Sequence, residues 1–409
     1  MKTPRASGMN VVGLDVGTTK VCAIVGKEDQ GKIGISAVGL APSSGLRKGV
    51  VVDRDLAAAS IRKAIRDASD KAGIGITSAY VGIAGGHIKG FAGKGTIAIK
   101  DRLVREDDIA RLIDSAGAVY VPVERDVLHV VPAGFRLDGR NGITDPLGMS
   151  GSRLEANVHI VTGSVTSVQD LIACCRKAGV EVLDIVLEPL ASAGAILSEA
   201  EKKAGVILVD IGGGTTDIAF YQGGMLRHTA VLALGGNHLT NDVAVGLGVS
   251  GDEAEQIKKK YGYALAHMAE EARGGPDVFE VTGKDGKSSE VSLRYLSEIT
   301  QARCEEFIGL VKKEMDNVSS RYKATAVVLT GGTALVKGIR ELAQEMFALP
   351  ARIGVPGDIQ DKGLVRSPIY ATGVGLVRYG LSRHVLPDLE AGGILERMKK
   401  WVSGFLYEE

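Results

Sequence analysis

The chain has 409 residues, enough for about two to four lobes rather than one hydrophobic core. Basic and acidic residues balance at 49 each and aromatic residues make up only 4%, so nucleic acid is not an expected partner. Glycine is the outlier at 55 residues, about 13% against roughly 7% in average proteins, which predicts many tight turns and close backbone approaches to a ligand.

The first residues of the chain and the spacing of its cysteines indicate the cellular compartment of the protein. Residues 1–10 are polar and lack the apolar stretch of a signal peptide, and no run reaches 18 apolar residues, so we expect a cytoplasmic protein. The spacing of the four cysteines fits neither a zinc site nor a disulfide framework. Reduced, buried thiols are therefore expected.

Strand and helix patterns alternate along the first half, as in layered α/β proteins. Three strands joined by glycine-containing turns are predicted at 10–16, 20–26 and 33–40. A helix at 53–72 and a strand at 79–83 follow. From about 85 to 163 the pattern is irregular, with one helix near 106–118, which indicates an inserted subdomain. Regular alternation then returns, with a helix at 168–178, a strand at 180–187 and a helix beginning after Pro189.

The second half repeats the opening. Residues 210–217 (DIGGGTTD) echo residues 15–20 (DVGTTK), and in each copy an apolar strand turns on glycine and threonine into another strand. The two aspartates are 195 positions apart, which fits a duplicated domain better than a solenoid repeat. Further on we expect helices at 237–261 and 291–318, a polar hairpin-like excursion between them, a final strand at 325–329 and a closing helix at 367–383.

Both loops suit a phosphate chain, which needs backbone N–H donors free of side chains and a cation to complete its shell. An ordinary hairpin turn is the alternative for either loop alone. Together, the two could clamp one triphosphate, with Asp15 and Asp210 holding Mg²⁺ through water. Glycine pairs at 235–236 and 331–332 each open a helix, where a phosphate or purine could lie. The P-loop and Rossmann fingerprints are missing.

These motifs resemble the signature segments of the actin/Hsp70/sugar-kinase ATPases, over about residues 10 to 385. The small-residue helices at 188–194 and 370–375 belong to the same pattern. Residues 235–242 (GGNHLTND), the insertion at 85–163 and a detached C-terminal helix make the chain most similar to the FtsA family of bacterial cell-division actin homologues. The resemblance implies an α/β, actin-like fold. Two duplicated ribonuclease-H-type domains would surround a nucleotide cleft, with an inserted subdomain in each half and a C-terminal amphipathic helix.

The resemblance also implies domain boundaries. The first actin-like domain (1A) would comprise 10–84, 164–203 and about 367–386, and would carry the interaction subdomain 1C at 85–163. The second (2A) would comprise 204–240 and 325–366, with subdomain 2B at 241–324. A linker at 387–393 would lead to a helix at 394–409.

Site residues carry over from the family motifs onto matching positions. The residues implied to bind ATP are Asp15, Gly17, Thr18, Thr19, Lys20, Asp210, Gly212, Gly213, Gly214, Thr215, Thr216, Asp217, Gly235, Gly236, Asn237, Glu255, Lys258, Gly331, Gly332 and Thr333. For Glu255 and Lys258, a solvated ion pair is the alternative. Glu188 is the candidate for orienting an attacking water, although acidic residues favour helix starts in any case. We expect slow ATPase activity at most and no transferase activity.

The segment after Pro387 has its apolar residues at helical spacing, within an arc of about 140°. These residues are Ile394, Leu395, Met398, Trp401, Val402, Phe405 and Leu406. A last helix packed on the body is the alternative. The Gly-Gly linker, the single tryptophan and the flanking cations favour a membrane surface, and the resemblance implies the same role.

The function implied by the resemblance is that of an ATP-binding, self-associating protein. It would tether the FtsZ ring to the cytoplasmic face of the inner membrane at the division site and recruit later division proteins through 85–163. The acidic C-terminal tail of FtsZ would dock on the second insertion at Arg303, with Arg294 as second choice. A pilus-assembly ATPase of the PilM type and a small-molecule kinase are the alternatives. The C-terminal helix argues against the first, and the lack of a recognisable general base beside an acceptor pocket argues against the second.

Overall fold

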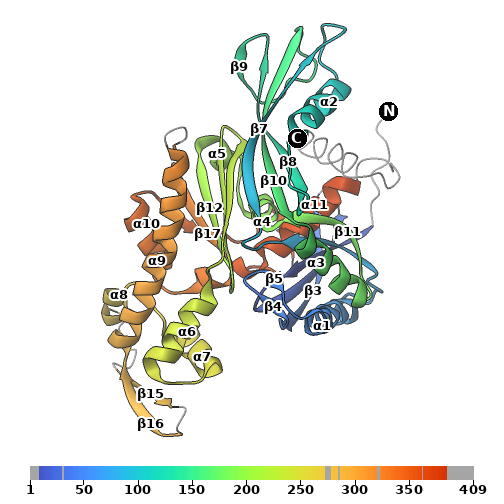
Figure 1. Ribbon diagram of the computed structural model, residues 1–409. Coiled ribbons are helices and arrows are strands. Elements are labelled where there is room, and N and C mark those ends of the chain that lie inside the picture. Colours follow the sequence, from blue (N-terminus) through green and yellow to red (C-terminus); the bar gives the residue numbers. More distant parts are fainter. Residues whose placement is uncertain are drawn as a thin grey trace.

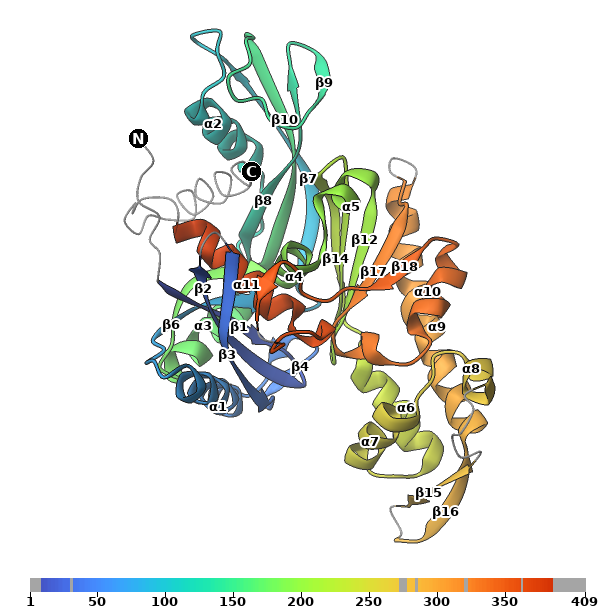
Figure 2. The same cartoon turned by 180° about the vertical axis from the view of Figure 1, so that it is seen from behind.

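The computed structural model of the protein describes residues 9–29, 32–271, 278–283, 286–319, 323–361 and 363–384. Figure 1 shows two large sheets in the middle of the molecule. Residues 89–164 project at the top and residues 236–292 form a lobe at the lower left, and the view from behind in Figure 2 shows the same arrangement. The two insertions therefore lie at opposite ends of the molecule. Among the described residues, no helix is long and apolar enough to cross a membrane.

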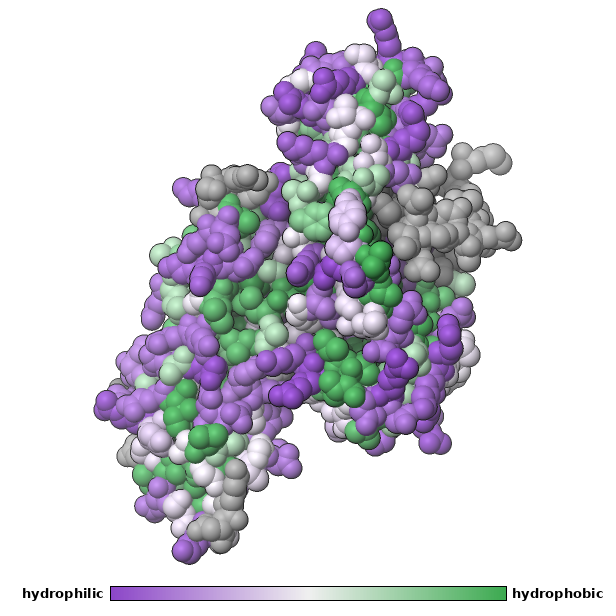
Figure 3. Space-filling view, in the orientation of Figure 1, coloured by the Kyte–Doolittle hydropathy of each residue, from purple (hydrophilic) through white to green (hydrophobic). Residues whose placement is uncertain are grey.

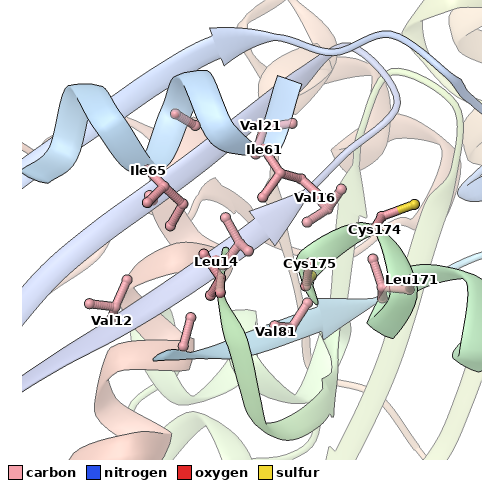
Figure 4. Packing of buried hydrophobic residues seen from close by; sticks show 14 of the residues in the cluster. Val12, Leu14, Val16, Val21, Ile61, Ile65, Val81, Leu171, Cys174 and Cys175 are labelled. Carbon is pink, nitrogen blue, oxygen red and sulfur yellow. The ribbon is translucent and has the colours of Figure 1, made fainter. Parts of the chain in front are cut away.

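The first sheet has six strands in the order β11-β6-β1-β2-β3-β19. Their bounds are β1 Asn10–Val16, β2 Lys20–Asp29, β3 Lys32–Pro42, β6 Ser78–Ile83, β11 Glu181–Leu187 and β19 Ile359–Gln360. Helices α1 (Arg54–Ala72) and α3 (Val165–Lys177) cover one face. Figure 4 shows alternate residues of β1, including Leu14, packed against these helices and against Cys174 and Cys175. All four cysteines are free and buried, as predicted.

The second sheet has five strands in the order β14-β13-β12-β17-β18. Their bounds are β12 Val206–Ile211, β13 Thr216–Gln222, β14 Met225–Leu232, β17 Ala326–Thr330 and β18 Ala351–Ile353. Apart from the parallel pairing of β19 with β3 at the edge of the first sheet, each sheet runs through two antiparallel pairings and then two parallel ones. This shared order and direction is the structural counterpart of the sequence repeat.

Two helices form the layer between the sheets: α4 (Glu188–Ile196) and α11 (Ala371–His384). They cross closely, because a Cβ atom added to Gly375 would lie 1.8 Å from the carbonyl oxygen of Ala191. Only glycine allows such an approach. The outer face of the second sheet is covered by α9 (Leu293–Ser319) and α10 (Ile339–Phe347). The small-residue segments singled out in the sequence are thus the two central helices.

The first insertion is a four-stranded sheet with one helix. Its elements are β7 Lys89–Ala98, α2 Glu106–Gly117, β8 Arg125–Leu137, β9 Arg140–Ile143 and β10 Arg153–Ser164, with the strand order β7-β10-β8-β9. Although it interrupts the first half, it is anchored to β14 of the second half. Met225 belongs to its core, the Arg227 guanidinium donates to the carbonyl of Ala133, and the ring of His159 bonds the Thr229 hydroxyl at 2.7 Å.

The second insertion differs from the sequence prediction in its helices. It contains α6 (Gly236–Leu247), α7 (Gly251–Tyr261), α8 (Ala266–Glu271) and the hairpin β15 (Val278–Thr282) to β16 (Ser288–Ser292). The single helix predicted at 237–261 is two helices. Gly248 ends α6 in the left-handed conformation, with φ of 66°, and Ser250 caps the start of α7 through a bond to the Glu253 N–H.

The elements at the end of the second half also differ from those predicted from the sequence. The strand predicted at 325–329 is β17, but two short strands, β18 and β19, follow it, so it is not the last. Residues 359–360, assigned to the second domain, pair with β3 of the first sheet. The closing helix predicted from 367 begins with the 3₁₀ turn η2 (Pro368–Tyr370), and α11 starts at Ala371.

Four short elements remain: β4 Leu46–Arg47, β5 Val50–Val51, α5 Glu199–Ala204 and the 3₁₀ turn η1 Gly332–Leu335. Isolated bridges join Leu103 to Ser150 and Tyr263 to Lys337. The predicted linker at 387–393 and membrane helix at 394–409, with all seven of its apolar residues, lie outside the described residues.

Candidate functional site

The two glycine-threonine loops are matching hairpins that contact each other. In the first loop, the Gly17 N–H donates to the Lys20 carbonyl at 3.0 Å. In the second, the Gly212 N–H donates to the Thr215 carbonyl at 2.9 Å. A Cβ atom on Gly213 would lie 2.2 Å from Thr19. The loops therefore meet face to face, and a side chain at this position of the second loop would collide with the first.

A cavity of about 520 Å³ opens beside these loops, between the two halves. Pockets for small molecules typically have volumes of ~300–1,000 Å³. The predicted residues that line it are Asp15, Gly17, Thr18, Thr19, Lys20, Glu188, Asp210, Gly212, Gly213, Gly214, Thr215, Asp217, Gly236, Asn237, Glu255, Lys258, Gly331, Gly332 and Thr333. In Figure 3 the outline of the molecule is notched between the lower-left and lower-right lobes, the two halves that meet at this cavity.

Two of the predicted residues support the cavity without lining it. The Thr216 hydroxyl, on β13, donates to the Leu234 carbonyl at 2.8 Å and is buried. At Gly235, an added Cβ would lie 2.8 Å from the backbone of Gly212 and Gly213, so this glycine lets the start of α6 pack on the second loop. Both residues shape the wall of the cavity from behind.

Asp15 stands at the end of β1 and pairs with Lys20 across the hairpin, with 3.0 Å between Asp15 Oδ2 and Lys20 Nζ. Burial alone would lower the pKa of Lys20, but the Asp15 carboxylate outweighs burial, and the net direction is upward. Lys20 therefore stays charged. It supplies the first loop with a cation, as the sequence predicted.

The second loop is acidic instead. Asp210 accepts a hydrogen bond from the Ser192 hydroxyl at 2.6 Å, and burial together with the charge of Asp15 raises its pKa to about 6. Burial and the charge of Asp210 raise the pKa of Asp217, which faces it across the hairpin. Burial and the charge of Asp15 likewise raise the pKa of Glu188. Four acidic side chains, Asp15, Glu188, Asp210 and Asp217, therefore line this part of the cavity around Lys20.

Glycine is required where the backbone passes Asp210. Gly331 has φ of 85°, and a Cβ atom there would lie 2.4 Å from Asp210 Oδ1. Its position explains the glycine pair after β17. The backbone turns over the carboxylate and continues into η1, one wall of the cavity.

Glu255 and Lys258, from α7, form an ion pair at 2.5 Å that lines the cavity. Glu255 also accepts a bond from the Thr240 hydroxyl at 2.5 Å, and Lys258 bonds the same hydroxyl at 2.9 Å. Burial would raise the pKa of Glu255, but the bonds from Lys258 and Thr240 and the charge of Lys258 together outweigh it, and the pKa falls. The pair is thus largely shielded, and the alternative of a freely solvated pair does not describe it.

Several lining residues were not predicted from the sequence: Lys259, Gly262, Leu335, Val336, Pro368, Ile369 and Thr372. Thr372 could have been found, because it lies in the small-residue segment 370–375, and its hydroxyl donates to Asp210 at 3.3 Å. Leu335 ends the η1 turn that begins at the predicted glycine pair, and Lys259 is next to Lys258 on α7. The remaining residues come from chain connections whose path only the fold reveals.

The two arginines proposed as partner contacts lie on α9, away from the cavity lining. Arg303 is engaged by Asp242, at 2.5 Å and 3.0 Å, and by Glu306, and its side chain is 24% exposed. Arg294 is 69% exposed and pairs with Glu270 at 3.3 Å and Glu298 at 3.0 Å. Arg294 is therefore the more accessible of the two.

Solved structures show which class of protein this arrangement defines. The fold matches the PilM-PilN type IV pilus biogenesis complex with a TM-score of 0.66 at 14% identity, covering 94% of this chain and 100% of the other. It matches MreB5 of Spiroplasma citri bound to ADP with a TM-score of 0.54 at 16% identity, covering 98% and 99%. The chain has an actin-like fold.

Sequence comparison resolves the family. The model for "Cell division protein FtsA" matches residues 207–375, and the model for "SHS2 domain inserted in FTSA" matches residues 85–162. FtsA of Pseudomonas aeruginosa is 44% identical over 97% of this chain and 98% of its own length. FtsA of Escherichia coli K12 is 34% identical over 96% and 97%. The chain belongs to the FtsA family of cell division proteins.

Proposed function

We propose that this protein binds ATP between its two halves, self-associates, and tethers the FtsZ ring to the cytoplasmic face of the inner membrane at the division site. The observation that carries the proposal is the cavity between the matched loops. It offers glycine backbone from two sides and a cation in the first loop, Lys20, which is the chemistry a triphosphate requires. Family membership supplies the setting in cell division.

The residues present also suit Mg²⁺. Carboxylate oxygens are the ligands that this cation prefers, and it keeps several of its waters. Burial and the charge of neighbouring acids both raise the pKa of Asp210 and Asp217, and a bound cation would offset both effects. Asp15 and Asp210 would hold the ion through water, and it would neutralise charge on the phosphates.

A substitution that places a bulky side chain in the cavity would test ATP binding. A Cβ atom on Gly332 would have Ile369 Cγ2, at 3.9 Å, as its nearest neighbour, so Gly332→Leu can extend into the cavity without displacing protein atoms. We expect the affinity for a fluorescent ATP analogue with Mg²⁺ to fall at least tenfold, or about 1.4 kcal/mol. Gly357→Leu, at a glycine with no atom within 4 Å of an added Cβ, is the control. Equal affinities in both variants would contradict the proposal.

The tethering part of the proposal involves three surfaces. We place the acidic tail of FtsZ on the α9 face, with Arg294 now preferred to Arg303 because of its exposure. We assign other division proteins to residues 85–163 and lipid to 394–409. Deletion of 394–409 should abolish co-sedimentation with liposomes while leaving ATP binding intact. Arg294→Glu should weaken binding of the tail and leave sedimentation unchanged. The reverse pattern would contradict the assignment of these surfaces.

A further inference from the structure

A second, much smaller cavity adjoins the one between the loops. Four residues line both: Gly17, Thr18, Glu188 and Thr215. The small cavity has a volume of about 20 Å³. One buried water needs at least ~10–15 Å³ on this measure, together with two to four polar partners, so there is room for a single water and not for a larger ligand.

His87 is the lining residue whose hydrogen-bonding capacity is unused. The backbone N–H of Ser164 donates to its Nδ1 atom at 3.2 Å, so Nδ1 carries no proton. Burial and the nearby charge of Arg125 lower the pKa of His87, so the ring is neutral at pH 7. A neutral ring with bare Nδ1 carries its hydrogen on Nε2. That Nε2 is buried, and within the described part of the chain it has no hydrogen-bond partner. An unsatisfied buried N–H costs about 1–3 kcal/mol.

Glu188 offers the complementary group. Its side chain lies against the end of β6, where a Cβ atom on Gly82 would be 3.4 Å from Glu188 Oε1. Gly82 lines the small cavity as well, so the carboxyl group stands at the wall that both cavities share. Burial and the charge of Asp15 raise the pKa of this carboxyl, which favours its keeping a proton that a neighbouring water gives up.

We propose that the small cavity is a site for one water molecule, which accepts a hydrogen bond from His87 Nε2 and donates one to Glu188, and that this water attacks the terminal phosphate of ATP. The inference rests on the proposed function. The water oxygen forms a bond to the terminal phosphorus, and the bond from that phosphorus to the oxygen shared with ADP breaks. ADP leaves with the bonding electron pair, and the proton of the water passes to the Glu188 carboxylate. His87 is a positioning residue in this step, because it only orients the water.

Three variants separate this role from a structural one. His87→Phe keeps a planar ring but removes the donor, whereas His87→Gln retains a side-chain N–H. His267→Phe, at an exposed histidine of α8, is the control. We expect phosphate release by His87→Phe to fall at least tenfold while its Kd for ATP changes less than twofold, and His87→Gln to remain within about threefold of the wild type. A purely structural role would instead change the Kd or the melting temperature of both His87 variants together.

A second readout does not depend on turnover. A high-resolution crystal structure should show one ordered water within hydrogen-bond distance of His87 Nε2 and Glu188, and ¹⁵N spectra should show the neutral ring protonated on Nε2. A dry cavity, a ring protonated on Nδ1, or phosphate release that is undetectable or insensitive to His87 would overturn the inference while leaving ATP binding in place. Failure of the wild type to bind ATP would instead overturn the proposed function.

Discussion

The two glycine-threonine loops have the same hairpin geometry but different side chains. The side chains of the first loop fit the space that the second loop leaves. At an offset of 195 residues, Thr18 and Thr19 of the first loop correspond to Gly213 and Gly214 of the second. The threonines of one loop pack onto the glycines of the other, since Cβ atoms on Gly213 and Gly214 would lie 2.2 Å from Thr19 and 2.4 Å from Thr18. The first loop therefore carries the threonine side chains, and the glycines of the second loop leave space for them.

The charged residues of the two loops differ in a complementary way as well. Lys20 corresponds to Thr215, and Cys22 corresponds to Asp217. The first loop therefore holds a balanced pair, Asp15 with Lys20, whereas the second holds two buried acids, Asp210 and Asp217, with raised pKa values. Two identical loops would present either two cations or no cation at all. Divergence leaves one cation in the first loop and two acidic side chains in the second.

The largest effect should come from making the loops alike. In Gly213→Thr the new side chain collides with Thr19, and overpacking of this kind costs about 1–3 kcal/mol. We expect ATP affinity, measured by equilibrium titration, to fall by up to about a hundredfold. Adding Thr19→Gly should restore most of the affinity by moving the side chain to the other loop. Gly75→Thr, where an added Cβ has no neighbour within 4 Å, should bind as the wild type does. Normal binding by Gly213→Thr alone would refute the complementary fit.

Removing the cation of the first loop should have an intermediate effect. Lys20→Met leaves Asp15, only 6% exposed, without its partner, and the loss of a hydrogen bond to a charged group costs about 1.5–3 kcal/mol. Urea unfolding of the nucleotide-free protein should show this loss. Lys177→Met, which breaks a pair with Asp55 on the surface, should unfold like the wild type. Equal stability of the two variants would mean that the pair in the loop is effectively solvated.

The smallest effect should be a change in pH dependence at Asp217. Its pKa is raised above the ordinary value of 3.8, so the folded protein keeps a proton that the unfolded chain has lost. The unfolding free energy of the wild type therefore falls as pH rises from about 4 towards the folded pKa. Asn does not titrate, so Asp217→Asn should gain stability relative to the wild type over this range. Urea titrations in the presence of a chelator measure the difference. A difference independent of pH would show that Asp217 ionises as it does in water.

The cavity was largely predictable from the sequence, because its key residues lie in two local repeats. A hairpin that turns on glycine after an apolar strand specifies its own geometry, so the positions of Asp15 and Asp210 at strand ends follow from the local pattern of residues. Pro368 and Ile369 could not be placed in this way. They reach the cavity through a connection whose route depends on β19 pairing with β3, and a strand of two residues leaves no periodic signal.

The errors in the predicted fold and site come from features that local sequence patterns do not reveal. The apolar spacing of 237–261 continues across Gly248, and the break between α6 and α7 depends on a left-handed residue that periodicity does not detect. The pairing of Arg303 with Asp242 is likewise a contact across 61 positions that sequence reasoning could not foresee. His87 was missed because its significance lies in an unused nitrogen beside a cavity.

The double attachment of the first insertion has a mechanical consequence. The insertion enters and leaves through the first sheet, yet Arg227 and Thr229 of β14 fasten it to the second. If the angle between the halves changes, the insertion must either break these bonds or bend where it leaves the first sheet. The direction in which its outer surface points would then change with the angle between the halves.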